Sequence, residues 1–178
     1  MSIEHNNIYP NCSYVIRAVQ LGTDTKANLY HKLNQEGIQL NPFAEQLFDD
    51  KRFLVSATPH SIETIELQVK QLGCLEGATM PQIFDRAKEL GLRLCSLEVG
   101  PQLRLQYTEQ TEGAVGKPAT KNRAPFGSLT IISSPIAWDH DFPKGFYLRT
   151  IEGELWLRGY SADFEHVFSP EDTLIFCR

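Results

Sequence analysis

Two aspartates and a histidine in the C-terminal third have the residue types that metal binding or acid–base catalysis requires. Asp139 and Asp141 flank His140, so on an extended backbone both carboxylates point to the same side of the chain. Such a pair can hold a divalent cation or act as acid and base, and His166 is a further candidate for this site. The neighbouring Pro143 favours another interpretation, in which the aspartate side chains form a turn. We therefore expect no bound metal, and Asp139, Asp141 and His166 stay as candidates for a catalytic role.

A second candidate site is a surface of aromatic and arginine side chains on a predicted β-hairpin. Residues 146–151 and 154–160 have strand-like patterns and are separated by Glu152-Gly153, which predicts a two-residue turn with Ile151 opposite Glu154. In this register hydrophobic residues share the core-facing side. The other side carries Tyr147 opposite Arg158, Arg149 opposite Trp156, and Tyr160 beyond them. This face could stack a planar group and attract an anion, or it could be a half-solvated sheet face that contributes stability alone.

The segment TEGAVGKPATKNR resembles a phosphate-binding loop, but two of its residues disagree with that motif. Thr111 stands where the first glycine is required, and Pro118 stands where a hydroxyl group should reach magnesium. A strand is expected after the segment, whereas the motif needs a helix whose N-terminus faces the phosphates. We therefore interpret Lys117, Lys121 and Arg123 as parts of a basic loop that does not hydrolyse nucleotides.

The elements that would position these residues are predicted from hydrophobic periodicity and turn residues. Residues 1–58 read as a small helical N-terminal region, and the turn-forming segment 56–61 is the best boundary candidate. Residues 59–178 are expected to form an α+β domain that packs with this region as one compact unit.

Within residues 59–178, a strand near residues 65–69, a helix that begins after Thr79 and a strand over 92–97 predict one β-α-β unit. Further strands are expected at 103–107, 128–133, 146–151, 154–160 and 173–177. The predicted fold is therefore α+β, with a mainly antiparallel sheet in the C-terminal half.

Composition excludes several classes of protein. The chain has 178 residues and a formal net charge of -5, which argues against broad, nonspecific binding to nucleic acid. Its four cysteines include no C-x-x-C pair, so a zinc site is disfavoured and reduced thiols are expected. The N-terminal sequence does not match a secretory signal, and no apolar stretch approaches the ~20 residues of a membrane span. We expect a cytoplasmic protein without a cofactor.

Five segments resemble a family of uncharacterised bacterial proteins: EGATMPQIFDRAKELGLRLC, EVGPQLRLQYTEQTEG, NRAPFGSLTIISSP, FPKGFYLRTIEGELWLRGY and EHVFSPED. The resemblance extends from about Glu76 to Asp172. Members of this family are sometimes given the automatic label of helicase. That label is not supported here, because the sequence lacks a phosphate-binding loop. The resemblance implies a bacterial family and no established activity.

The residues together favour a binding module for a small molecule or a protein, which uses the loop and hairpin over 117–160. One alternative is a metal-dependent or hydrolytic enzyme that uses Asp139, Asp141 and His166, with Arg149 holding an anionic substrate. A second alternative, which the net charge disfavours, is a nucleic-acid accessory protein that uses the basic loop and the aromatic face. The sequence leaves the ligand, the partner and the oligomeric state open.

Overall fold

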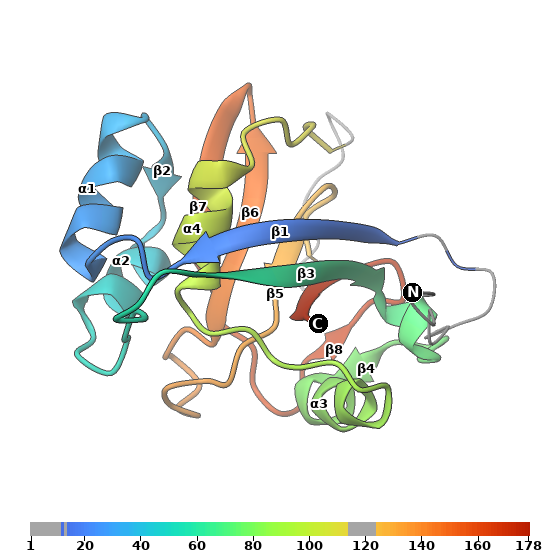
Figure 1. The fold of residues 1–178 in the computed structure, drawn as a ribbon. Coiled ribbons are helices and arrows are strands. Elements are labelled where there is room, and N and C mark those ends of the chain that lie inside the picture. Colours follow the sequence, from blue (N-terminus) through green and yellow to red (C-terminus); the bar gives the residue numbers. More distant parts are fainter. Residues whose placement is uncertain (1–11, 13, 114–123) are drawn as a thin grey trace, which may run out of the picture.

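A seven-stranded mixed sheet forms the centre of the computed structural model, which describes residues 12, 14–113 and 124–178 (Figure 1). The strand order is β1-β3-β9-β5-β6-β7-β2. In sequence order these strands are β1 (Val15–Leu21), β2 (Gln39–Leu40), β3 (His60–Gln68), β5 (Leu129–Ile131), β6 (Gly145–Ile151), β7 (Glu154–Tyr160) and β9 (Thr173–Cys177). The sheet is strongly curled, so β6 and β7 run across the direction of β1 and β3 in Figure 1.

The remaining elements flank this sheet. The helices are α1 (Lys26–Gln35), α2 (Pro42–Asp49), α3 (Met80–Glu89), α4 (Val99–Gln106) and the short 3-10 helix η1 (Val69–Leu72). A second, two-stranded sheet pairs β4 (Ala78–Thr79) with β8 (Val167–Phe168). Within the described ranges, no helix combines the length and apolar character that crossing a bilayer requires.

The prediction of mixed helices and strands is confirmed, but the predicted sheet was too simple. β5 pairs with β9 and β2 pairs with β7 in parallel, whereas the other neighbouring strands are antiparallel. The sheet also takes β1 and β2 from the N-terminal region. The described residues on both sides of the predicted 58/59 boundary therefore share one sheet.

The helical prediction for the N-terminal region was wrong for Val15–Leu21. This segment forms β1 and pairs along its whole length with β3. Its sequence, VIRAVQL, contains β-branched residues that favour strands, and Val19 and Leu21 alternate into the core. Helices α1 and α2 do form within this predicted helical region.

The predicted β-α-β unit was also wrong. Helix α3 forms after Thr79, with the expected capping box to Gln82. Residues 92–97, however, make two isolated bridges to the sheet instead of a regular strand. The predicted strand at 103–107 lies mostly in α4, where Val99 and Leu103 have helical spacing and are both buried.

Two hydrophobic clusters lie on opposite faces of the sheet. Alternate side chains of β9 point to different faces: Ile175 belongs to the first cluster, and Leu174 and Phe176 belong to the second. Helices α1, α2 and α4 contribute to the first cluster, and α3 and η1 contribute to the second. Tyr160, at the end of β7, packs against the second cluster.

Candidate functional site

The β6–β7 hairpin has the register that the sequence predicts. Ile151 pairs with Glu154, and the connecting Glu152 and Gly153 have φ values of 52° and 78°. Two successive positive φ values match the twist of the strands, which explains the glycine at the second position. The core-facing side chains of Phe146 and Leu148 are buried. The outward-facing arginines and aromatic residues are half-buried, so the two faces separate as predicted.

The outward face holds two guanidinium groups without an acidic partner among the described residues. Arg158 donates from Nε to the hydroxyl group of Tyr147 at 2.7 Å, and its guanidinium carbon lies 4.9 Å from the ring centroid of Trp156. The buried N–H groups at Arg149 Nε and Trp156 Nε1 have no hydrogen-bond acceptor in the described part of the chain. This face therefore carries two positive charges that no described acidic side chain neutralises.

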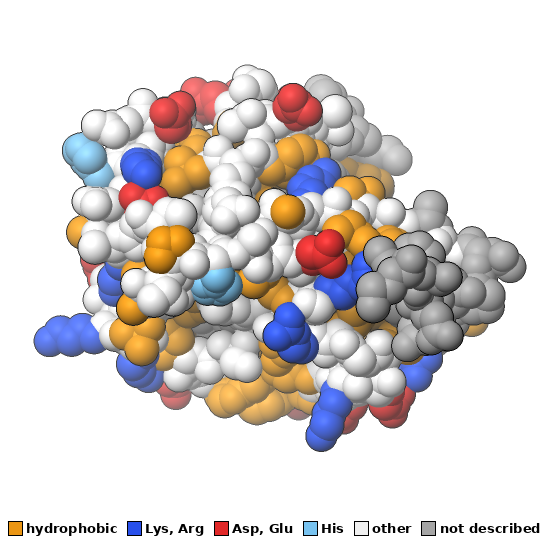
Figure 2. Space-filling model, viewed as in Figure 1, with side chains coloured by type: hydrophobic (Ala, Val, Ile, Leu, Met, Phe, Trp, Pro, Cys, Tyr) orange, Lys and Arg blue, Asp and Glu red, His pale blue; other side chains and the backbone are white. Residues whose placement is uncertain are grey.

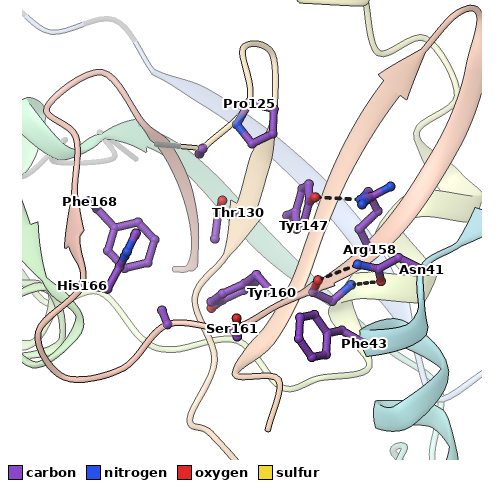
Figure 3. A pocket seen from close by; sticks show the side chains of 13 residues that line it. Asn41, Phe43, Pro125, Thr130, Tyr147, Arg158, Tyr160, Ser161, His166 and Phe168 are labelled. Atoms are coloured by element: carbon purple, nitrogen blue, oxygen red, sulfur yellow. Dashed lines mark hydrogen bonds between the residues drawn. The ribbon is translucent and has the colours of Figure 1, made fainter. Parts of the chain in front are cut away.

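A pocket of about 280 Å³ lies at one end of this face (Figure 3). Three of the five predicted binding residues, Tyr147, Arg158 and Tyr160, line this pocket, whereas Arg149 and Trp156 do not. The other lining residues are Asn41, Phe43, Ala124, Pro125, Thr130, Gly159, Ser161, Ala162, His166 and Phe168. In Figure 3, Tyr160 lies in the middle, with Tyr147 and Arg158 on one side and His166 and Phe168 on the other.

The ring of Tyr160 is fixed at the centre of the pocket by a hydrogen bond and by packing. Its hydroxyl group donates to the carbonyl oxygen of Ile131 at 3.2 Å. Burial raises the pKa of Tyr160 well above its ordinary value, so the phenol stays neutral at physiological pH. The neutral ring of Tyr160 therefore forms part of the pocket lining.

One wall of the pocket is built by Asn41, which caps α2. Its Oδ1 accepts hydrogen bonds from the backbone N–H groups of Ala44 at 2.9 Å and Gly159 at 2.7 Å. Its Nδ2 donates to the carbonyl oxygen of Gly159 at 2.9 Å. A Cβ atom on Gly159 would lie 2.6 Å from the backbone carbonyl carbon of Phe43, so glycine permits the close contact between α2 and β7.

The opposite wall is formed by His166 and Phe168, whose rings meet edge to face with centroids 4.9 Å apart. The carboxylate of Asp163 accepts hydrogen bonds from the backbone N–H groups of Glu165 and His166, at 2.9 and 2.8 Å. These bonds, together with His140 at 3.3 Å, hold the pKa of Asp163 below its ordinary value. Asp163 therefore positions His166, although no motif in the sequence singles it out.

Asp139 and Asp141 lie in an exposed turn before β6. The turn is closed by the backbone, because Phe142 donates its N–H to the carbonyl oxygen of Asp139 at 3.1 Å. The ammonium group of the buried Lys144 donates to the carbonyl oxygens of Asp139 and Phe142, at 2.5 and 2.6 Å. Burial lowers the pKa of Lys144. This buried cation holds the turn from the inside of the protein, and no sequence pattern predicts its burial.

The proposed set of Asp139, Asp141 and His166 is not brought together as a metal site. His166 lines the pocket, whereas the two aspartates are exposed in the turn and do not line it. Among the described residues, no group of three or more histidine, cysteine, aspartate or glutamate side chains could hold a metal ion. The catalytic role of these residues stays an untested prediction.

Within the described lining of the pocket, the charged side chains include a cation and no carboxylate. Among the described lining residues, Arg158 carries a guanidinium group and none carries a carboxylate. On the face drawn in Figure 2, acidic, basic and hydrophobic side chains are interspersed. The predicted basic loop with Lys117, Lys121 and Arg123 lies outside the described residues.

Comparison with known proteins adds no further constraint. No family model, curated protein or solved structure matches this chain. The resemblance to uncharacterised bacterial proteins therefore stays a prediction, and the function is argued from the residues of the pocket.

Proposed function

We propose that the protein is a binding module for a small ligand that carries a planar apolar group and an anionic group. The observation that carries this proposal is the convergence of Arg158 with the rings of Tyr147 and Tyr160 in one pocket whose described lining residues include no carboxylate. The planar part of the ligand lies against Tyr160, and its anionic group accepts hydrogen bonds from Arg158. Cytoplasm is the proposed compartment, and the source is proposed to be bacterial.

The size and lining of the pocket limit the ligand. Its volume of about 280 Å³ is near the lower end of the roughly 300–1,000 Å³ typical of ligand pockets. A single ring with one short substituent fits this space better than a dinucleotide. The hydroxyl groups of Thr130 and Ser161 add polar contacts at the pocket surface, so the ligand need not be fully apolar.

The geometry of Arg158 favours an anion over a neutral ligand. The hydrogen bond to Tyr147 and the contact with Trp156 hold the guanidinium in place, which reduces the entropy lost on binding. Nε is the nitrogen that bonds to Tyr147, and the two terminal nitrogens can meet a carboxylate in a bidentate arrangement. A protein partner that inserts an acidic side chain into the pocket would use the same chemistry.

The test uses benzoate and its neutral counterpart benzamide as probes, because both have one ring and nearly the same shape. Each is titrated into ¹⁵N-labelled protein at millimolar concentrations while amide chemical shifts are recorded. We expect benzoate to bind more tightly and to shift the signals of Arg158, Gly159 and Tyr160. Equal binding of the two probes, or shifts confined to residues outside the pocket, would contradict the proposal.

A further inference from the structure

Two buried cysteines from distant parts of the chain are in contact. Cys95 lies in the irregular segment after α3, and Cys177 lies in β9. Their side chains are 3% and 7% exposed, and their sulfur atoms are 2.8 Å apart. Both are free thiols in this structure. Formation of a disulfide bond of about 2.05 Å would require the two sulfurs to approach by only about 0.8 Å.

The backbone holds both cysteines in place. Arg93 and Cys177 exchange a pair of backbone hydrogen bonds, each 2.9 Å long. The N–H group of Cys95 donates to the carbonyl oxygen of Ile132 at 2.8 Å. The two side chains are therefore close together because hydrogen bonds fix the backbone position of both cysteines.

We propose that Cys95 and Cys177 form a reversible disulfide bond when the protein meets hydrogen peroxide. Neither cysteine lines the proposed ligand pocket. The expectation of reduced thiols describes the resting state, and the disulfide is the oxidised state. Peroxide is the appropriate oxidant because it is small enough to reach sulfurs with little exposed surface.

Cys177 is assigned the first reaction because it is the more exposed of the two cysteines. Its hydrogen bond with Cys95 lowers its pKa, burial opposes this effect, and the positive charge of Arg93 lowers the pKa further, which favours the reactive thiolate. Burial raises the pKa of Cys95. Cys95 therefore acts as the resolving thiol.

The proposed reaction has two steps, and its atoms and electrons balance. The Cys177 thiolate attacks one oxygen of hydrogen peroxide, which breaks the O–O bond, gives a sulfenic acid and releases the other oxygen as water after protonation. The sulfur of Cys95 then attacks the sulfur of the sulfenic acid, and a second water leaves with the proton of Cys95. Two thiols are oxidised to one disulfide, and one peroxide is reduced to two waters.

The test treats the intact protein with hydrogen peroxide and measures its mass before and after reduction with dithiothreitol. We expect a loss of two hydrogen atoms, a non-reducing peptide map that links Cys95 to Cys177, and recovery of both thiols on reduction. The melting temperature should rise on oxidation, because the bond constrains the unfolded chain.

Cys95→Ala and Cys177→Ala should each abolish the linked peptide, whereas the matched variant Cys74→Ala should retain it. The peptide map of the unaltered protein decides the question even if a core variant fails to fold. Conversion of Cys177 to a sulfinic acid while Cys95 stays reduced would overturn the proposal. Two unreacted thiols under conditions that oxidise Cys12 or Cys74 would also overturn it.

Discussion

The side-chain amide of Asn41 forms a reciprocal pair of hydrogen bonds with the backbone of Gly159, although 118 residues separate the two in the sequence. The same Oδ1 atom accepts from Ala44 and caps α2. One buried side chain thus fixes the start of a helix and its position against the strand that carries Arg158. The wall of the proposed pocket depends on this relationship.

Replacement of Asn41 tests its structural role. Asn41→Ala removes the cap, which contributes about 1 kcal/mol, and leaves the backbone groups of Gly159 without partners, at about 1–3 kcal/mol for each buried group. We expect urea denaturation to show a loss of about 3 kcal/mol or more in the free energy of unfolding.

Thr25→Ala is the matched control for this experiment. Thr25 caps α1 on the exposed surface, where its hydroxyl oxygen accepts a hydrogen bond from the backbone N–H of Asn28 at 3.1 Å. Its replacement should therefore lower the free energy of unfolding by only about 1 kcal/mol. Equal losses in the two variants would show that the contact with Gly159 adds nothing beyond the cap.

The buried Lys144 provides a second test, which concerns the turn before β6. Lys144→Met keeps an unbranched side chain but removes the donors to the carbonyl oxygens of Asp139 and Phe142. We expect a loss of about 1.5–3 kcal/mol in the free energy of unfolding. The exposed Lys88 offers a control, because Lys88→Met should stay within about 0.5 kcal/mol of the unaltered protein. An unchanged free energy of unfolding in Lys144→Met would contradict the role given to Lys144 in this turn.

The depressed pKa of Asp163 predicts a pH dependence. Because the folded-state pKa is below the unfolded value, the carboxylate stabilises the fold above its ordinary pKa, and this contribution is lost as pH falls through the folded-state value. The melting-temperature difference between the unaltered protein and Asp163→Asn should therefore be larger near about pH 6 than near about pH 3.

Asp141→Asn controls for a general effect of removing charge from this region, because Asp141 is exposed and accepts no hydrogen bond from the described residues. If its melting-temperature difference changes with pH as much as that of Asp163→Asn, the turn around Asp163 is not the cause.

The hairpin could be predicted from the sequence because its determinants are local. The alternation along 146–151 and 154–160, with Gly153 at a position of positive φ, is sufficient to set the register. The two faces follow from that register. Three of the five outward residues reach the pocket because they lie toward the same end of the hairpin.

The rest of the site could not be predicted because it depends on distant contacts. Nothing near Asn41 in the sequence indicates that it meets Gly159, and nothing near Lys144 indicates that it is buried. The wrong prediction of a strand at 103–107, where α4 forms, has a similar cause. Leu103 and Leu105 alternate as in a strand, but Val99 and Leu103 pack into the first hydrophobic cluster with helical spacing.

The most direct test of the central claim compares two arginines on the same face of the hairpin. Arg158 lines the pocket and Arg149 does not, so Arg149→Met is the matched control for Arg158→Met. Melting temperatures first establish that both variants are folded. We predict that Arg158→Met weakens benzoate binding by about tenfold or more, as expected for a lost charge-assisted hydrogen bond. The affinity of Arg149→Met should stay close to that of the unaltered protein. Equal losses in both variants, or unchanged binding by Arg158→Met, would contradict the assignment of this pocket.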